Sequence, residues 1–249
     1  MKILYLGCSN STLATFLSKE NDVTFTQDKI TLKYVKDINP DIVISYRYRY
    51  IISADIVTEY SDKILNLHIS YLPYNRGASP CFWSIVDNTK KGVTIHMIDE
   101  GLDTGDILYQ SEINPEKSET LRQYYNRMNN EIQNLFILKW HKIKNLNFIK
   151  QKQDNSKATL HTVEQTRQFM AQLELNSKWD TTIEEVMMKT DEQLIDEIQR
   201  IRTKNNTHWM DVVRLAFRLA PEEAREIFKN IKECDQKINE LLKELADND

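Results

Sequence analysis

Two polar side chains of complementary chemistry stand on one face of a short apolar segment. From Leu65 to Ile69 apolar and polar residues alternate as in a half-buried strand, so Asn66 and His68 point the same way. The dipeptides Leu72-Pro73 and Arg76-Gly77 then indicate a turn. An amide N–H2 can donate to an oxygen that gains negative charge, and an imidazole with a pKa near ~6.5 can accept a proton at neutral pH. This pair predicts a reactive site at the end of a strand.

The elements that must position this pair alternate between strand and helix. Strands are expected over residues 2–7, 22–27, 41–46, 64–70, 92–99 and 106–113. Helices are expected over 11–19, 53–60, 79–87 and 118–146, the last with Ser118 as its N-cap, and 149–158 is expected to be a polar loop. This alternation predicts βαβ units and a parallel sheet, in which ligands bind beyond the carboxyl ends of the strands.

The chain changes character after about Thr181. From there on it shows no strand pattern, no glycine and a single proline. Apolar residues recur every three or four positions in 222–246, which predicts an amphipathic helix with a narrow apolar stripe. The stripe comprises Ala224, Ile227, Phe228, Ile231, Cys234, Ile238, Leu241, Leu242 and Leu245. We therefore expect a main domain over 1–180 and a helical region over 181–249, whose stripe either docks on the protein's own core or joins two copies as a dimer.

Composition excludes several classes of function. The 249 residues, 41% hydrophobic and 28% charged, are typical of a globular protein, and no apolar run approaches the ~20 residues needed to span a bilayer. The three cysteines lie far apart, which favours neither a disulfide framework nor a zinc site and indicates a reducing cytoplasm. A net charge of −4 without a basic stripe argues against a nucleic-acid partner, and nothing in the sequence points to a membrane.

The turn after the first expected strand reads Gly7-Cys8-Ser9-Asn10, which is not the GxGxxG of a dinucleotide-binding fold. An enzyme that uses a nicotinamide cofactor is therefore not expected. Ser9 and Asn10 could cap the following helix or contact a phosphate.

A longer pattern surrounds Asn66 and His68. It consists of Asn66-x-His68-x-Ser70-x-Leu72-Pro73, Arg76-Gly77, Pro80, Trp83 and the stretch GVTIHMIDEGLDTGDILYQ at 92–110. In this order and spacing the pattern resembles the folate-dependent formyltransferases, which include glycinamide ribonucleotide, methionyl-tRNA and sugar N-formyltransferases. The specific resemblance covers roughly residues 41–113, and a looser one continues to about 180.

The resemblance implies a fold, a reaction and a set of site residues. The fold class is α/β, a Rossmann-like formyltransferase domain with a mixed, mainly parallel sheet, plus an all-helical C-terminal region. The reaction moves a formyl group from the co-substrate 10-formyltetrahydrofolate to an amine, without a metal. The implied catalytic residues are Asn66 as donor to the oxyanion, His68 as base and Asp103 as the carboxylate that orients the imidazole. Asp106 competes with Asp103, although a loop role suits Asp106 better.

Two loops are expected to bind the folate, and a third set of residues the acceptor. The folate residues implied by the resemblance are Tyr50, Ile51, Ile52, Asp99, Glu100 and Gly101. The acceptor candidates are Ser9, Asn10, Arg76, Gly77, Phe82 and Trp83, with Arg76 as the phosphate ligand. Helix capping remains open for Ser9 and Asn10, and core packing for Phe82 or Trp83. We expect Ser70 to bond the backbone of the turn and His96 to be structural.

The acceptor expected from the resemblance is a nucleotide-linked amino sugar used in bacterial surface glycan or lipopolysaccharide synthesis. A dTDP-4-amino-4,6-dideoxyhexose is the first choice and a UDP-linked diamino sugar the second. The alternatives are glycinamide ribonucleotide formyltransferase, methionyl-tRNA formyltransferase, formyltetrahydrofolate hydrolase and a binding module without catalysis. The segment before Asn66 is short for the family, and the helical tail matches nothing in its catalytic core.

Overall fold

The computed structural model describes residues 1–172, 178–187 and 191–246. The chain divides into two compact units, Met1–Met188 and Lys189–Asp249. The division lies after residue 188, whereas the sequence suggested 180, because helix α7 (Ile183–Met187) buries Ile183 and Val186 in the core of unit 1.

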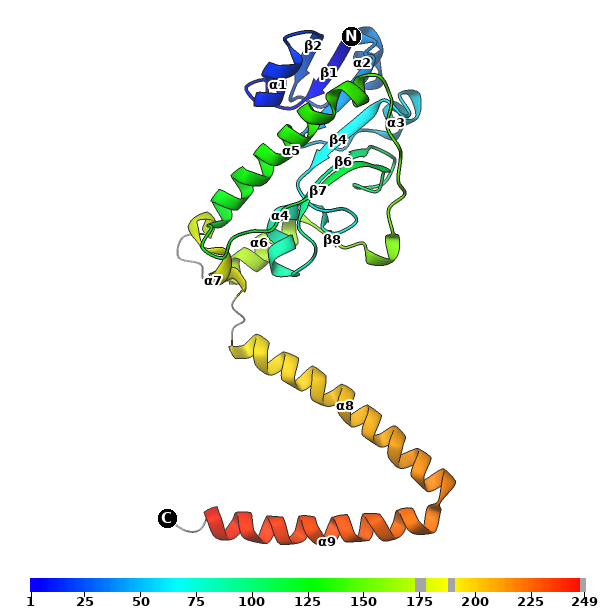
Figure 1. Cartoon of the computed structure of the whole chain (residues 1–249), viewed down its shortest axis with the longest axis vertical. Helices are drawn as coiled ribbons and strands as arrows, with labels where there is room; N and C mark the ends of the chain where they lie inside the picture. The colour runs from blue at the N-terminus through cyan, green and yellow to red at the C-terminus, as the bar shows by residue number, and fades with distance from the viewer. Residues whose placement is uncertain (173–177, 188–190, 247–249) are drawn as a thin grey trace. The chain divides into compact units, whose positions relative to one another are not determined.

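In the described residues, one mixed sheet organises unit 1 (Figure 1). The strand order is β2-β1-β3-β4-β6-β7, in which β6 pairs antiparallel with β4 and β7 pairs antiparallel with β6. The strands are β1 (Lys2–Leu6), β2 (Asp22–Thr26), β3 (Ile42–Tyr46), β4 (Ile64–His68), β6 (Gly92–Met97) and β7 (Ile107–Glu112). The expected mixed, mainly parallel sheet is confirmed. A short ladder of β5 (Arg76–Gly77) and β8 (Leu160–His161) forms a second sheet.

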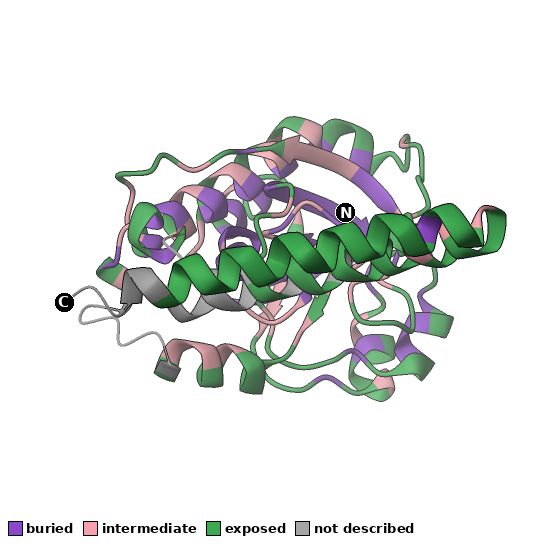
Figure 2. Ribbon diagram, turned by 90° about the horizontal axis from the view of Figure 1, so that it is seen from below, coloured by how far each residue is buried: buried purple, intermediate pink, exposed green. Residues whose placement is uncertain are grey.

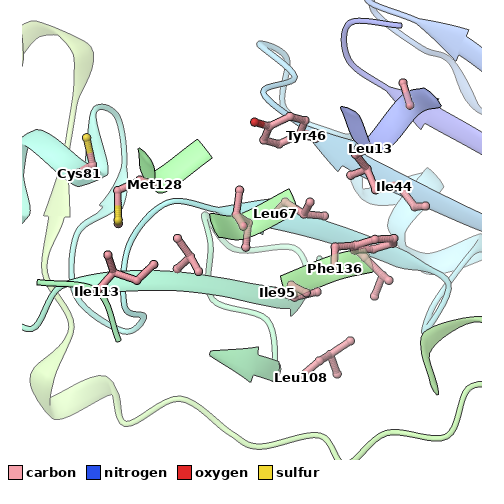
Figure 3. Packing of buried hydrophobic residues seen from close by; sticks show 14 of the residues in the cluster. Leu13, Ile44, Tyr46, Leu67, Cys81, Ile95, Leu108, Ile113, Met128 and Phe136 are labelled. Atoms are coloured by element: carbon pink, nitrogen blue, oxygen red, sulfur yellow. The ribbon is translucent and has the colours of Figure 1, made fainter. Parts of the chain in front are cut away.

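Helices cover both faces of the main sheet because successive strand residues point to opposite sides. Ile3 and Tyr5 of β1 face a large core with α1 (Thr12–Leu17), α4 (Pro80–Val86) and α5 (Leu121–Lys144), while Leu4 and Leu6 face a smaller core. The helices of the smaller core are α2 (Leu32–Ile38) and α3 (Ala54–Glu59). Figure 3 shows the larger core, in which side chains of the strands and of α5 interdigitate. Unit 1 is therefore a three-layer α/β structure.

Local sequence explains where the long helix α5 begins. It starts at Leu121 with Thr120 as N-cap, and Gln123 completes a capping box by accepting from the Thr120 backbone N–H. The expected cap Ser118 is wrong, because Thr120 has the glutamine three residues later that a capping box requires. The expected loop at 149–158 contains only the 3₁₀ turn η1 (Asn155–Lys157) and a bridge from Gln151 to Ile107.

The remaining described elements follow α5 and β7 in the chain. They are α6 (Val163–Gln172), the 3₁₀ turn η2 (Lys178–Asp180), α8 (Asp191–Leu219) and α9 (Pro221–Ala246). Unit 2 consists of α8 and α9, joined at Ala220, and Phe217 meets Phe228 beside this joint at 5.5 Å between ring centroids. Most side chains of α9 are exposed, as Figure 2 shows by its green colour. Among the described helices, none combines the length and apolar character that a bilayer-spanning helix needs.

The packing of α5 on the sheet makes one stability prediction. Phe136 is fully buried between helix and sheet, so Phe136→Ala should lower the free energy of unfolding by about 3–5 kcal/mol through lost burial and the cavity left behind. Leu138 on the same helix is 74% exposed, and Leu138→Ala should change it by less than about 0.5 kcal/mol. Urea unfolding of both variants checks this, and equal losses would contradict the orientation of α5.

Candidate active site

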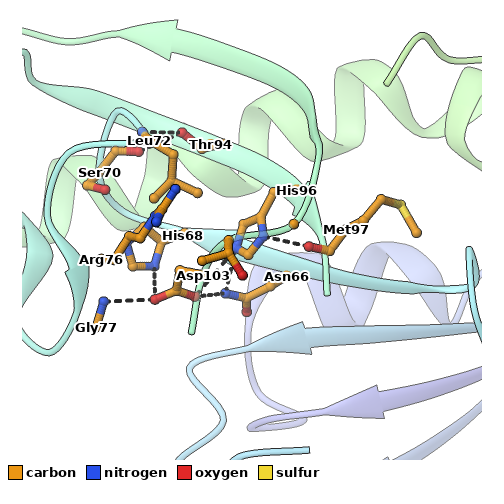
Figure 4. Close-up of polar contacts among 12 residues, drawn as sticks. Asn66, His68, Ser70, Leu72, Arg76, Gly77, Thr94, His96, Met97 and Asp103 are labelled. Atoms are coloured by element: carbon orange, nitrogen blue, oxygen red, sulfur yellow. Dashed lines mark hydrogen bonds and ion pairs between the residues drawn. The ribbon is translucent and has the colours of Figure 1, made fainter. Parts of the chain in front are cut away.

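The register between two strands brings the side chains of Asn66, His68 and His96 together. The antiparallel pairing of β4 with β6 sets Asn66 directly opposite His96, and His68 opposite Thr94. Directly opposed residues project from the same face of a sheet, so Asn66, His68 and His96 share one face (Figure 4). His96, which the sequence suggested to be structural, thus lies inside the candidate site.

The loop between β6 and β7 adds the carboxylate. Asp103 has φ of 53°, a left-handed conformation that aspartate tolerates better than most residues. Its Oδ2 accepts from the Gly77 N–H at 2.9 Å, and its backbone oxygen accepts from the Gln153 side chain at 2.8 Å. The same Gln153 amide also donates to the backbone oxygen of Gly105 at 2.7 Å. A distant glutamine therefore holds the loop that presents Asp103.

The hydrogen bonds of His68 decide which ring nitrogen can act as a base. Nε2 lies 3.1 Å from the backbone oxygen of Asn75, a pure acceptor, so Nε2 carries the proton in the neutral ring. The lone pair is then on Nδ1, which faces Oδ2 of Asp103 at 3.6 Å. A proton captured on Nδ1 would lie against the carboxylate. The turn that supplies the Asn75 oxygen is held by Ser70, whose hydroxyl donates to the Tyr74 oxygen at 2.7 Å, which confirms the expected role of Ser70.

His96 and Asn66 are matched in the same way. Nδ1 of His96 lies 2.7 Å from the Met97 backbone oxygen and must carry the proton, which leaves Nε2 as an acceptor. Nδ2 of Asn66 lies 3.1 Å from this Nε2 and 3.3 Å from Oδ1 of Asp103. Both amide protons of Asn66 are thus engaged, and donation to a substrate oxygen requires that oxygen to replace one of these two acceptors.

Burial and neighbours shift the protonation of this group. Burial lowers the pKa of His68 below its usual value, against the opposing effect of the Asp103 charge, so the imidazole is neutral at neutral pH. Burial alone would raise the pKa of the Asp103 carboxyl, but His68 and His96, which are protonated at the low pH where that carboxyl would titrate, together with the Gly77 N–H, outweigh it and hold that pKa well below its usual range. A neutral imidazole beside a charged carboxylate is the state that a general base requires.

His68, His96 and Asp103 also offer atoms that lie within 4.8 Å of one another, close enough for a metal ion. In the observed arrangement hydrogen bonds engage the donor atoms of two of these residues: Asn66 binds His96, and Gly77 and Asn66 bind the two oxygens of Asp103. The arrangement is that of a hydrogen-bonded polar group.

The site opens into a cavity of about 1110 Å³. This exceeds the ~300–1,000 Å³ typical of a pocket for one small ligand. Its lining includes Asn66, His68, His96 and Asp103. All six residues expected to bind folate also line it, namely Tyr50, Ile51, Ile52, Asp99, Glu100 and Gly101. The side chain of Asp99 accepts from the Gly101 N–H and from the Thr104 hydroxyl, so it shapes its own loop.

The structure divides the expected acceptor residues. Gly77 and Phe82 line the cavity, whereas Arg76 and Trp83 are not among its lining residues. The Arg76 guanidinium donates to Gln153 at 2.7 Å and to Asn155 at 2.8 Å, so it supports the Asp103 loop through Gln153, in place of the expected phosphate contact. Trp83 stacks on His161 at 3.9 Å and donates to Thr166, which agrees with the core packing considered for it, and its contact with the acceptor stays a prediction.

Ser9 and Asn10 are likewise absent from the cavity lining. Both are exposed in the turn before α1, where the Asn10 side chain accepts from the Cys8 thiol and the helix N-cap is Ser11. The capping role considered for Ser9 and Asn10 therefore falls to the next residue.

A second wall of the cavity was missed from the sequence. Helix α5 contributes Arg122, Tyr125, Asn126 and Asn129, and η2 contributes Trp179. The spacing of the four α5 residues (three, one and three positions) places them on one helix face. That spacing is a usable signal, but only once the helix is known to face a cavity.

Comparison with known proteins agrees with this geometry. The family model described as formyl transferase matches residues 11–139, about half of the chain. The methionyl-tRNA formyltransferase of Clostridioides difficile (strain 630) is 33% identical over 120 residues, which are 46% of this chain and 39% of that protein. That of Thermodesulfovibrio yellowstonii is 40% identical over 101 residues, 39% of this chain and 33% of that protein. The chain thus spans well under half the length of these curated relatives.

Solved structures match over more of the chain. The formyltransferase PseJ from Anoxybacillus kamchatkensis, in complex with UDP-4,6-dideoxy-4-formamido-L-AltNAc and tetrahydrofolate, is 40% identical with a TM-score of 0.70. The match covers 75% of this chain and 97% of PseJ. A 4-N formyltransferase from Francisella tularensis shares the fold, with 23% identity, a TM-score of 0.57, and coverage of 68% and 79%. The chain belongs to the formyl transferase family.

Proposed function

We propose that the protein is a sugar N-formyltransferase that moves the formyl group of 10-formyltetrahydrofolate to the amino group of a nucleotide-linked amino sugar. The observation that carries the proposal is the arrangement of Asn66, His68 and Asp103 on one wall of a cavity large enough for two ligands. The solved structure that shares 40% of its sequence with this chain and is covered almost entirely by it holds a UDP-linked formamido sugar and tetrahydrofolate.

His68 performs the proton transfer in this proposal. The acceptor amine attacks the formyl carbon, a new C–N bond forms, and the bond from that carbon to the folate nitrogen N10 breaks. Nδ1 of His68 takes the proton that the amine loses, and the imidazolium is stabilised by Asp103 at 3.6 Å. Its other nitrogen stays fixed on the Asn75 oxygen. The proton then passes to N10, so the reaction consumes and releases none overall.

Asn66 stabilises the charge on the formyl oxygen. Its N–H2 group already points at two acceptors, His96 and Asp103, and the developing oxyanion replaces one of them. The gain appears as the oxygen becomes negative, because a charged acceptor binds an amide proton more strongly than a neutral imidazole does. The fixed tautomer of His96 keeps the amide in the orientation that offers protons rather than its oxygen.

The loops at 50–52 and 98–102 fit the folate. Ile52 is nearly buried and Ile51 exposes 80% of its surface at the cavity, so together with Leu102 they offer an apolar wall to a flat ring. The net charge of −4 favours a small acceptor over tRNA, which is the substrate named for the methionyl-tRNA relatives. A UDP- or dTDP-linked amino sugar of surface glycan synthesis is the acceptor class we propose, and the cytoplasm is the compartment that supplies such nucleotides and folate.

The direct test mixes the purified protein with 10-formyltetrahydrofolate and a panel of UDP- and dTDP-linked amino sugars, and follows sugar masses. We expect one acceptor to gain a single formyl group and His68→Ala to abolish transfer. His141→Ala serves as the matched control, because His141 is exposed on α5 away from the cavity, and it should leave the rate unchanged. More than about a tenth of the wild-type rate in His68→Ala would exclude His68 as the base. Loss of formyl-folate without a formylated sugar would indicate hydrolysis.

The pH dependence of transfer tests the pair of His68 and Asp103. Because burial lowers the pKa of His68, kcat/KM should rise with pH along one ionisation with a midpoint below ~6.5 and then level off. Asp103→Asn removes the charge that opposes this lowering, so the midpoint should move to still lower pH while the plateau falls. Any ionisation of the acceptor amine is common to both enzymes. An upward shift in Asp103→Asn would contradict the assigned pairing.

We also propose that unit 2 joins two copies of the chain. Ala224, Ile227, Ile231, Cys234, Ile238 and Leu241 follow one another at intervals of three and four, the heptad spacing of a coiled coil. Ala224 is covered at the joint with α8, whereas Ile227, Ile231, Ile238 and Leu241 are each about half exposed. The first core positions are Ala224, Ile231 and Ile238, and the second are Ile227, Cys234 and Leu241. Isoleucine at two of the three first positions, with leucine at the last second position, favours two strands.

The charges beside this stripe suit a second copy in parallel. In two parallel helices, the residues that flank the stripe would face each other as the pairs Glu223–Phe228, Asn230–Asp235 and Lys237–Leu242. None of these three pairs brings two like charges together.

The double variant Ile231→Asp and Ile238→Asp should convert a dimer into a folded monomer in sedimentation, because two buried charges would face their own copies. Gln236→Asp with Asn239→Asp adds the same charges on the opposite, exposed face of α9 and should leave the dimer intact. A dimer that persists in the first variant would place the dimer contact elsewhere.

A further inference from the structure

The cavity has a wall to which the proposed chemistry assigns no role. Tyr125 and Asn126 reach it from α5, and Trp179 reaches it from η2. The Tyr125 and Trp179 rings meet edge to face at 5.5 Å between centroids and an angle of 63°. Both side chains are only partly buried, so aromatic surface remains available on the cavity side.

An ion pair holds this aromatic pair in place. Arg122 on α5 donates to Asp180 at 2.8 Å, and Asp180 is the residue next to Trp179. η2 is thereby fastened to α5 beside Tyr125. We regard Arg122 as a positioning residue for Trp179, since its guanidinium is already committed to a carboxylate.

Among the residues that the structure describes, one cation beside the aromatic pair has no anionic partner. The guanidinium groups in the cavity lining belong to Arg47, Arg49 and Arg122. Within the described part of the chain, Arg47 makes neither an ion pair nor a side-chain hydrogen bond, and its guanidinium carbon lies 5.8 Å from the centre of the Tyr125 ring. Arg49 instead lies 5.7 Å from the Tyr50 ring, on the wall proposed for folate.

The backbone of Arg47 is unusual as well. Its φ of 58° lies in the left-handed region, which arginine rarely adopts. Such outliers cluster where function fixes a side chain, and this one turns the chain immediately after β3, at the cavity. Arg76, which the sequence suggested for phosphate, is already bound to Gln153 and Asn155, so Arg47 is the guanidinium available to an anion on this wall.

We propose that Arg47, Tyr125 and Trp179 bind the nucleoside diphosphate part of the acceptor. The planar guanidinium of Arg47 pairs with the diphosphate, and the aromatic pair receives the base. The acceptor and the folate then contact different residues of the same cavity, with their reacting groups meeting at His68. This assignment rests on the proposed function for the sugar itself, but nucleotide binding can be measured without any formyl transfer.

The test is titration of the full-length protein with UDP and with dTDP, in the absence of folate, by calorimetry. Arg47→Ala should weaken nucleotide binding by about tenfold or more, as expected for loss of a charge-assisted hydrogen bond. Trp179→Ala should weaken it by a similar factor. Arg49→Ala is the matched control, with the same charge removed from the same loop, and should change binding less than about threefold. Unchanged thermal unfolding shows that the variants are folded.

Three results would overturn the assignment. The first is that neither UDP nor dTDP binds the wild-type protein at millimolar concentration, and the second is that Arg49→Ala weakens nucleotide binding as much as Arg47→Ala does. The third is kinetic. With an active acceptor, we expect Arg47→Ala to raise the KM for the sugar nucleotide and to leave the KM for 10-formyltetrahydrofolate unchanged. A raised KM for 10-formyltetrahydrofolate with an unchanged KM for the sugar nucleotide would overturn the assignment and place Arg47 at the glutamate carboxylates of folate.

The two proposals fail separately. Nucleotide binding that depends on Arg47, without transfer to any amino sugar, would leave this site standing and remove the proposed reaction. Formyl transfer to an amine that carries no nucleotide, from a protein that binds neither UDP nor dTDP, would do the opposite.

Discussion

The site depends on one buried carboxylate. Asp103 has a side chain that is 13% exposed, and taking a charge out of water costs several kcal/mol unless partners replace the lost hydration. The groups around it come from three elements: Asn66 on β4 and Gly77 on β5 donate hydrogen bonds to it, and His68 on β4 and His96 on β6 face it. The contacts that compensate the buried charge of Asp103 therefore also fix the positions of the groups that the proposed reaction needs. The stability of the fold and the proposed chemistry depend on the same contacts.

The same charge accounts for the protonation states around it. A neutral His68 is favoured by burial, yet its lone pair faces the carboxylate, so a captured proton enters a place already prepared for positive charge. This differs from a catalytic triad, in which the carboxylate holds the nitrogen that does not react. In the proposed mechanism the Asn75 carbonyl holds the nitrogen that does not react, and Asp103 faces the nitrogen that takes up the proton.

Local alternation and turn residues predicted the strands and most helices of the first half. The family resemblance, carried by a motif whose members lie within about forty positions of one another, implied the group of Asn66, His68 and Asp103. The contact of His96 with Asn66 could not be predicted because it depends on the antiparallel register of β4 and β6, which alternation alone does not set. The bonds of Arg76 could not be predicted because its partners, Gln153 and Asn155, lie in a segment that carries no strong pattern. Trp179 has no neighbour in sequence that marks it as part of a cavity.

In the proposed function, the transfer chemistry and the choice of acceptor rest on different parts of the chain. The reactive group and the proposed folate loops lie within residues 11–139, the part that matches the family model. Trp179 lies outside that part, on a short turn next to α5 that is joined to it by the Arg122–Asp180 ion pair and by the backbone bond from the Leu121 N–H to the Thr181 oxygen. Such an element can change without disturbing Asp103 or the strands beneath it. A family that keeps its transfer chemistry while exchanging acceptors needs this separation, and it explains why the shared motif identifies the reaction more firmly than the acceptor.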